Sequence, residues 1–156
     1  ICFLNPNSKI NRLYPKKTSQ IKMKNYPHQE LTKSIIGIYY NVYNELGYGF
    51  LEKVYHRAMI VELNKNGYEV EHEKKIEVFY KNEVVGTYIP DLIINKSVIL
   101  ELKCVEYLIE AHENQLINYL KATECEVGLV LNFGKDPQFK RKIFTNDLKK
   151  RNKYKD

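Results

Sequence analysis

Apolar and polar residues first follow a helical period. From residue 30 to 46, apolar side chains recur every three or four positions, which predicts an amphipathic helix. Gly47 and Gly49 come next and predict a tight turn. A second helical pattern covers residues 50–66 and ends at Gly67. The patterned region is therefore expected to begin with two consecutive helices.

The pattern then changes to one that is typical of strands. Residues 69–80 alternate loosely, and Lys81-Asn82 is a candidate hairpin turn. Further strands are expected at about 84–94 and 97–105. Because only Asn95-Lys96 separates these two strands, they should be antiparallel neighbours.

The last patterned elements predict a parallel strand pair. A third helix is expected at 109–122, an apolar strand at 126–133 and a short edge strand at 143–144. A strand, a helix and another strand in this order imply a right-handed crossover. The element order is helix, helix, three strands, helix, strand, so we predict a small three-layer α/β fold with helices flanking a mixed sheet.

Two charged residues interrupt the apolar strand at 98–105. Glu101 and Lys103 are two positions apart, so they share one face of the strand, whereas Leu100 and Leu102 share the other. Burying such charges without partners costs several kcal/mol. The pair therefore needs a third participant, and a metal ion is the leading candidate.

Asp91, which follows Pro90, is the second carboxylate of this candidate site. A hairpin that turns at residues 95–96 places Asp91 opposite residues 100–102, so its carboxylate and that of Glu101 can converge. Converging carboxylates suit Mg²⁺, with Mn²⁺ as the alternative ion. A bound ion could activate water for hydrolysis. Lys103 could orient or deprotonate that water, or neutralise charge on a phosphate.

Glu52 and Tyr55 share one side of the second helix because they are three positions apart. Glu52 is expected one turn into that helix. It could give the metal a third carboxylate, or it could simply favour the positive end of the helix. Tyr55 is expected to pack and to form a hydrogen bond rather than to act as a catalyst.

The third helix carries a polar flank of His112, Gln115 and Tyr119. Polar groups on a core-facing helix need partners. Gln115 and Tyr119 could contact Lys103, a carboxylate or a substrate phosphate, or they could be ordinary polar residues at a helix edge. His112 could stand behind the metal ligands and support them.

Three groups of these residues resemble motifs of known nucleases. Pro90-Asp91 followed by Glu101-Leu102-Lys103 is similar to the motif of the PD-(D/E)XK nuclease superfamily. The segment from Gly49 through Glu52 to Tyr55 resembles the GxxExxY signature, which names a bacterial family of small proteins with this fold. Gln115 and Tyr119 resemble the QxxxY element of exonuclease-like branches.

This resemblance extends over about residues 30–145 and implies a restriction-endonuclease-like core. It implies a Mg²⁺-dependent nuclease that hydrolyses phosphodiester bonds in DNA, with RNA as the second candidate. It assigns catalysis to Asp91, Glu101 and Lys103, and metal binding to Asp91, Glu101 and Glu52. It leaves Gln115, Tyr119, Tyr55 and His112 as supporting residues.

The distribution of charge keeps a second function open. The net charge is +6, but the basic residues are concentrated in residues 1–22 and 135–156, so the segment between them is acidic. A nuclease usually presents basic surface to nucleic acid. A catalytically silent nucleic-acid-binding or protein-interaction module is therefore the alternative, with Lys103 bridging the two acids. A homodimer or a partner subunit could also supply basic surface.

Composition suggests boundaries and a compartment. Residues 1–22 are expected to be a disordered basic leader, 23–145 the nuclease-like domain and 146–156 a basic tail. The three cysteines are widely spaced and suggest no disulfide framework, which fits the cytoplasm. No apolar run approaches the ~18–20 residues of a membrane span, so no membrane partner is expected. The resemblance to nucleases implies nucleic acid, and DNA first, as the partner.

Overall fold

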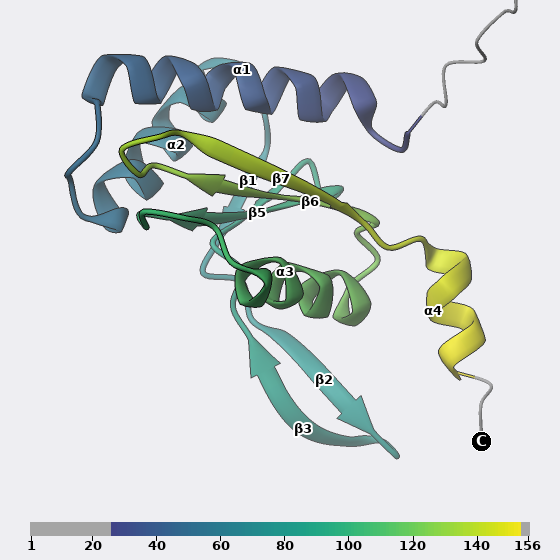
Figure 1. Cartoon of the computed structure of the whole chain (residues 1–156). Coiled ribbons are helices and arrows are strands. Elements are labelled where there is room, and N and C mark those ends of the chain that lie inside the picture. Colours follow the sequence, from purple (N-terminus) through teal and green to yellow (C-terminus); the bar gives the residue numbers. More distant parts are fainter. Residues whose placement is uncertain (1–25, 154–156) are drawn as a thin grey trace, which may run out of the picture.

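The computed structural model describes residues 26–153, and the leader predicted at 1–22 lies outside the described residues (Figure 1). The helices are α1 (Gln29–Leu46), α2 (Glu52–Lys65), α3 (Glu110–Ala122) and α4 (Asn146–Lys153). The strands are β1 (Val70–His72), β2 (Ile76–Tyr80), β3 (Glu83–Tyr88), β4 (Leu92–Ile94), β5 (Val98–Lys103), β6 (Val127–Asn132) and β7 (Gln138–Ile143). None of the helices in this part of the chain combines the length and the apolar character that crossing a bilayer would require.

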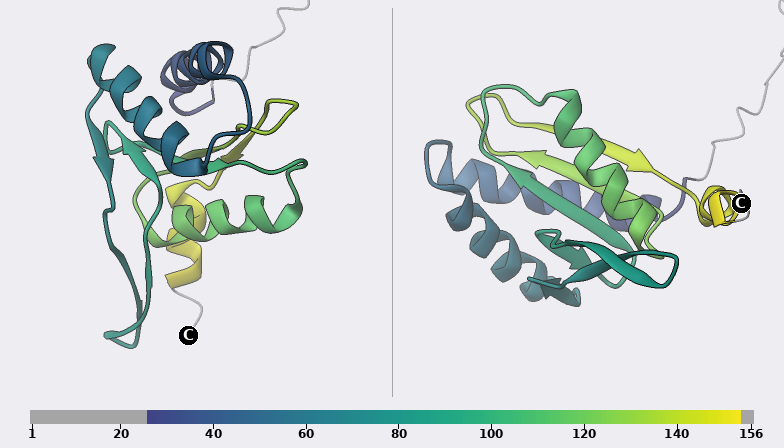
Figure 2. Two further views of the ribbon diagram at one scale, coloured as in Figure 1. Left: turned by 90° about the vertical axis from the view of Figure 1, so that its left-hand side faces the viewer. Right: turned by 90° about the horizontal axis from the view of Figure 1, so that it is seen from below.

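Five strands form one mixed sheet in the order β1-β4-β5-β6-β7. β5 and β6 are parallel, and the other neighbouring pairs are antiparallel. Helices α1 and α2 cover one face of the sheet and α3 covers the other (Figures 1 and 2). The predicted α/β architecture, a mixed sheet flanked by helices with a parallel crossover pair, is confirmed.

Each face of the sheet has its own apolar cluster. Leu100 and Leu102 belong to the cluster beneath α1 and α2, whereas Ile99 belongs to the cluster beneath α3. Because side chains alternate along a strand, Glu101 and Lys103 lie on the same face as Ile99. The two charged side chains of β5 therefore face the α3 side of the sheet.

The single strand predicted at 84–94 is wrong, because the chain divides there into β3 and β4. Within residues 26–153, β3 pairs only with β2, in a separate two-stranded ribbon that extends away from the sheet (Figures 1 and 2). The break contains Pro90, which has no N–H for a ladder hydrogen bond and restricts the residue before it. The predicted turn at Lys81-Asn82 is confirmed, and both of its residues have positive φ, at 46° and 67°.

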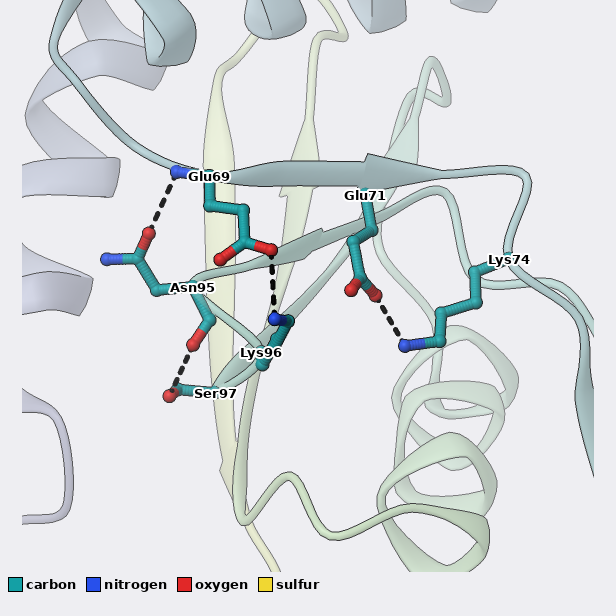
Figure 3. A network of polar contacts seen from close by, with 6 residues as sticks. All are labelled: Glu69, Glu71, Lys74, Asn95, Lys96 and Ser97. Atoms are coloured by element: carbon teal, nitrogen blue, oxygen red, sulfur yellow. Dashed lines mark hydrogen bonds and ion pairs between the residues drawn. The ribbon is translucent and has the colours of Figure 1, made fainter.

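The β4–β5 hairpin has the predicted turn and register. Leu92 pairs with Leu100, and Asn95 and Lys96 adopt φ values of 49° and 54°, as a tight hairpin turn requires. The Asn95 side chain accepts a hydrogen bond from Glu69 N–H at 2.9 Å, and Lys96 pairs with Glu69 (Figure 3). These contacts fix the turn, and the turn fixes which residue of β5 faces the segment before β4.

The C-terminal strand is longer than the sequence pattern predicted, and a helix follows it where only a basic tail was expected. The edge strand expected at 143–144 extends over Gln138–Ile143 and pairs antiparallel with β6. Part of the predicted tail forms α4, and Lys149 Nζ donates hydrogen bonds to the carbonyls of Thr123 and Cys125, both at 2.7 Å. These bonds hold the first half of α4 against the end of α3.

Candidate functional site

Asp91 lies between the ribbon and β4, directly after the buried Pro90. Its Oδ2 accepts a hydrogen bond from the backbone N–H of Leu102 at 2.7 Å. This bond joins the segment before β4 to β5 beyond the last paired residues of the ladder. It places the Asp91 carboxylate next to the residue that separates Glu101 from Lys103.

Glu101 and Lys103 form an ion pair on the α3 face of β5. Lys103 Nζ lies 2.7 Å from Glu101 Oε1, and the side chains retain 16% and 4% of their exposure. The other oxygen of Glu101, Oε2, is buried and has no hydrogen-bond partner among the described residues. A buried carboxylate oxygen without a partner carries a free-energy penalty, so this atom marks a place that suits a cation.

Electrostatics link Asp91, Glu101 and Lys103, which we call the acid–lysine group. Burial, followed by the charges of Asp91 and Glu52, raises the pKa of Glu101 from 4.5 to about 7, against the opposing effect of Lys103. Desolvation lowers the pKa of Lys103, but the hydrogen bond with Glu101 and the neighbouring acids outweigh it, so the pKa rises overall. Lys103 is therefore protonated at neutral pH.

Glu52 is the first residue of α2, not one turn into it as predicted, because the glycine turn continues to Leu51. Burial and the charge of Asp91 raise the pKa of the Glu52 carboxyl, whereas Lys103, His56 and a backbone hydrogen bond from Cys104 lower it. The Glu52 carboxylate thus lies within electrostatic range of the acid–lysine group and beside the end of β5.

Tyr55 ties together the loop that precedes α2. Its hydroxyl donates to Gly47 O at 2.7 Å and accepts from Phe50 N–H at 3.2 Å. Its ring is fully buried and stacks on Phe133 with centroids 4.4 Å apart. Gly47 has a φ of 68°, which glycine adopts at little cost. Tyr55 therefore fixes the turn from which Glu52 emerges.

The polar residues of α3 separate into two groups. Gln115 Nε2 donates to Tyr119 Oη at 2.7 Å. Burial raises the pKa of Tyr119, and Glu101, Asp91 and Lys103 also affect it, which places its hydroxyl near the acid–lysine group. His112 lies at the start of the helix, where its Nδ1 accepts a hydrogen bond from Ile109 N–H at 3.2 Å.

Two further residues, which the sequence did not single out, support the site. His56 Nε2 lies 3.1 Å from Asp91 O, and its position four residues after Glu52 on α2 could have indicated it. Asn132 is fully buried, and its amide bonds Val105 twice, accepting from N–H at 3.0 Å and donating to O at 2.8 Å. Only the folded structure brings Asn132 and Val105 together.

The residues at this site fit a divalent cation in part. Asp91 and Glu101 provide hard oxygen ligands, and Glu101 Oε2 is a buried oxygen that has no hydrogen-bond partner in the described part of the chain. Within residues 26–153, no group of three or more His, Cys, Asp and Glu side chains gathers in the manner of a metal cage. Mg²⁺ is commonly bound through one or two carboxylates together with waters and substrate phosphates, so two protein ligands are sufficient.

Comparisons with known proteins bear on the family and the fold of the chain. The sequence profile of the PD-(D/E)XK nuclease superfamily matches residues 29–143, most of the chain. The crystal structure of SSO0001 superposes with a TM-score of 0.50 and 21% identity over 78% of this chain. This likeness shows the fold alone, and the match spans 62% of that protein's chain. No curated protein sequence matches the chain. From the extent of the profile match, the chain belongs to the PD-(D/E)XK nuclease superfamily.

Proposed function

We propose that this protein is a divalent-metal-dependent nuclease that hydrolyses phosphodiester bonds in DNA, with RNA as the second candidate substrate. The observation that carries the proposal is the buried carboxylate of Glu101, which has one oxygen on Lys103 and the other without a partner among the described residues. Asp91 is held beside it. Membership of a superfamily that generally hydrolyses phosphodiester bonds supports the same reaction.

We assign metal binding to Asp91 and Glu101, with Glu52 as a third carboxylate. A Mg²⁺ or Mn²⁺ ion bound there would supply Lewis-acid stabilisation of a phosphate oxygen. Lys103, whose Nζ lies 2.7 Å from Glu101 Oε1, would orient or deprotonate the attacking water or stabilise negative charge on the phosphate. Gln115 and Tyr119 are proposed to orient the substrate phosphate from the α3 side. His112 supports the start of α3.

We also propose that the chain is of the GxxExxY type within the superfamily. The support comes from Gly49, Glu52 and Tyr55, whose residue types have distinct uses in this fold. Gly49 has a φ of 105° in the turn, Glu52 begins α2 near Asp91, and Tyr55 binds the turn from the helix. In this proposal the GxxExxY signature forms a turn and a helix start that together hold the Glu52 carboxylate beside the end of β5.

A cytoplasmic setting is proposed as well. Cys104 and Cys125 are both free thiols in the described part of the chain, and burial raises the pKa of each. Thiols of raised pKa are poorly reactive, and they persist in a reducing compartment. The proposed compartment therefore rests on the use of cysteine. Nucleic acid is the proposed partner because the proposed reaction is the hydrolysis of phosphodiester bonds.

One observation favours a second function. The ion pair of Lys103 with Glu101 already satisfies one carboxylate oxygen, as it would in a catalytically silent binding module. The two functions differ in what a divalent metal does to bound DNA. In the nuclease, metal permits cleavage, whereas in the silent module nucleic acid is bound and remains intact.

The test is a cleavage assay on labelled single-stranded and double-stranded DNA and on RNA, with Mg²⁺, Mn²⁺ or a chelator. We expect wild type to cut at least the DNA with metal, and Asp91→Ala and Lys103→Ala to be inactive. Activity that is absent on every substrate with both metals would support the silent module. The folded state of each variant is checked by circular dichroism, so that inactivity is not confused with unfolding.

A further inference from the structure

A cavity of about 380 Å³ opens at one end of the sheet. Three loops form its walls, which are residues 48–50 between α1 and α2, 104–106 after β5, and 133–135 between β6 and β7. These loops lie side by side at the left of Figure 1 and meet again in Figure 2. Cys104 directly follows Lys103 and Phe50 lies two residues before Glu52, so the cavity lies just beyond the end of β5, although none of Asp91, Glu101 and Lys103 lines it.

The walls of this cavity are held in place before any ligand arrives. The amide of Asn132 binds both backbone groups of Val105, and Phe133 N–H donates to Lys103 O at 2.7 Å. Tyr55 fixes the third wall through Gly47 O and Phe50 N–H. A site that is already formed loses little conformational freedom on binding, which favours affinity.

The lining of the cavity combines aromatic rings with a cation. Tyr48 and Phe50 are 59% and 50% exposed, so both aromatic rings remain accessible to a ligand. Lys135 stands exposed on the third loop, and Tyr43 Oη holds its backbone carbonyl at 2.7 Å. Glu106 is the acidic member of the lining and disfavours a phosphate in the cavity itself. Exposed rings with a cation at the rim suit a flat base that is joined to a phosphate.

We propose that this cavity binds an unpaired base of single-stranded nucleic acid, stacked on Phe50 or Tyr48, while Lys135 contacts the adjoining phosphate. The inference rests on the proposed function, because the base would be held beside the phosphodiester presented to the acid–lysine group. Bases in a duplex are stacked on one another and cannot offer a free face to these rings. The substrate class is therefore a single strand, a flap or a frayed end rather than continuous duplex.

The test measures binding in a chelator, so that cleavage plays no part. Short labelled oligonucleotides of one sequence are compared by fluorescence anisotropy as single-stranded DNA, single-stranded RNA and blunt duplex DNA. We expect a single strand to bind more tightly than the duplex, and the DNA and RNA arms to show which sugar is preferred. Phe50→Ala and Tyr48→Ala should each weaken single-strand binding by about five- to hundredfold.

Matched variants separate stacking from loss of fold. Tyr80→Ala removes another exposed ring, 63% exposed, from the β2–β3 ribbon outside the cavity, and it should leave affinity unchanged. Phe50→Trp should restore binding, because a larger ring still stacks. Oligonucleotides with 2-aminopurine at either end give a second readout, since stacking on wild-type protein should quench the fluorescence of one of them.

Equal affinity for single strand and duplex, or alanine variants that bind and quench like wild type, would overturn the inference. So would a wild type that binds no oligonucleotide and instead self-associates through this face. If the protein binds single-stranded oligonucleotides and quenches 2-aminopurine through Phe50 but cleaves no substrate, the base-binding inference stands and the proposed nuclease activity is wrong. If Phe50→Ala and Tyr48→Ala retain metal-dependent cleavage with the strand preference of wild type, the proposed nuclease activity stands and the base-binding inference is wrong.

Discussion

Lys103 Nζ lies 2.7 Å from Glu101 Oε1, although the two residues are only two positions apart on the same strand. Both side chains are largely withdrawn from water, so each charge depends on the other. Replacing Lys103 by methionine should therefore leave a buried carboxylate without its cation. We expect Lys103→Met to lower the free energy of unfolding by about 2–4 kcal/mol at about pH 8, where Glu101 of the wild type is ionised, measured by denaturant unfolding in a chelator.

The double variant Glu101→Gln with Lys103→Met provides the control. It removes both charges, so most of the lost stability should return. If the single variant is as stable as wild type, the ion pair does not form in solution. Catalytic data on Lys103 variants need this comparison, because a loss of activity could otherwise reflect unfolding.

Stability should also depend on pH through Glu101, whose pKa rises from 4.5 in the unfolded chain to about 7 in the fold. Below about pH 4.5 both states hold the proton and Glu101 imposes no penalty. Between about pH 4.5 and 7 the unfolded chain releases the proton while the folded protein keeps it, so stability falls as pH rises, and the loss is complete once pH has passed the folded pKa of about 7. Relative to Glu101→Gln, wild type should lose on the order of 1–3 kcal/mol between about pH 5 and pH 8.

The measurement is the difference in unfolding free energy between wild type and Glu101→Gln across pH, without divalent metal. Taking the difference cancels the groups that titrate in both proteins. A difference that does not vary with pH would mean that Glu101 has an ordinary pKa. Added Mg²⁺ should stabilise wild type more at the alkaline end, where the carboxylate is ionised.

The hydroxyl of Tyr55 should matter to catalysis although it lies outside the acid–lysine group. Tyr55→Phe removes the bonds to Gly47 O and Phe50 N–H and should cost about 1–3 kcal/mol of stability. It should also lower kcat, because the turn before Glu52 loosens. Tyr68→Phe removes a single bond to Ser34 Oγ elsewhere and should leave kcat unchanged. An unaltered kcat in Tyr55→Phe would limit this hydroxyl to a role in stability.

Gly134 permits a close approach between the β6–β7 turn and the end of β5. A Cβ at this position would lie 2.1 Å from Val105 O, so the backbone would have to move. Gly134→Ala should cost about 1–3 kcal/mol and shift the residues that follow Lys103. We expect a fall in cleavage rate of up to about a hundredfold.

Gly37→Ala is the matched substitution. Gly37 lies in α1 with nothing within 4 Å of an added Cβ, so alanine should be neutral or should stabilise the helix by up to about 1 kcal/mol. The two variants are compared by thermal unfolding and by initial cleavage rate. Equal behaviour would mean that the contact of Gly134 with Val105 does not support the site.

The geometry around β5 could be predicted because it depends on local rules. A two-residue turn at Asn95-Lys96 sets the register, and alternation along β5 then places Glu101 and Lys103 on one face. The Asp91 side chain reaches Leu102 N–H as that register requires. Each step uses only residues close together in the sequence.

Other features depend on contacts that no local pattern records. Pro90 divides an apparently continuous strand, so that β3 pairs with β2 in the ribbon while β4 pairs with β5 in the sheet. Asn132 gains its importance from Val105, which is 27 residues away in the chain. The polar segment that becomes α4 has little apolar patterning, and Lys149 is held by the carbonyls of Thr123 and Cys125.

The central claim is that the acid–lysine group is a metal-dependent hydrolytic centre, and cleavage by Asp91→Asn tests it most directly. Asparagine keeps an oxygen that can accept the hydrogen bond from Leu102 N–H, so the fold should persist while the charge is lost. We predict that wild type cleaves labelled DNA in Mg²⁺ but not in chelator, and that Asp91→Asn is slower by at least about a hundredfold. Cleavage that continues in chelator, or that Asp91→Asn performs at the wild-type rate, would contradict the claim.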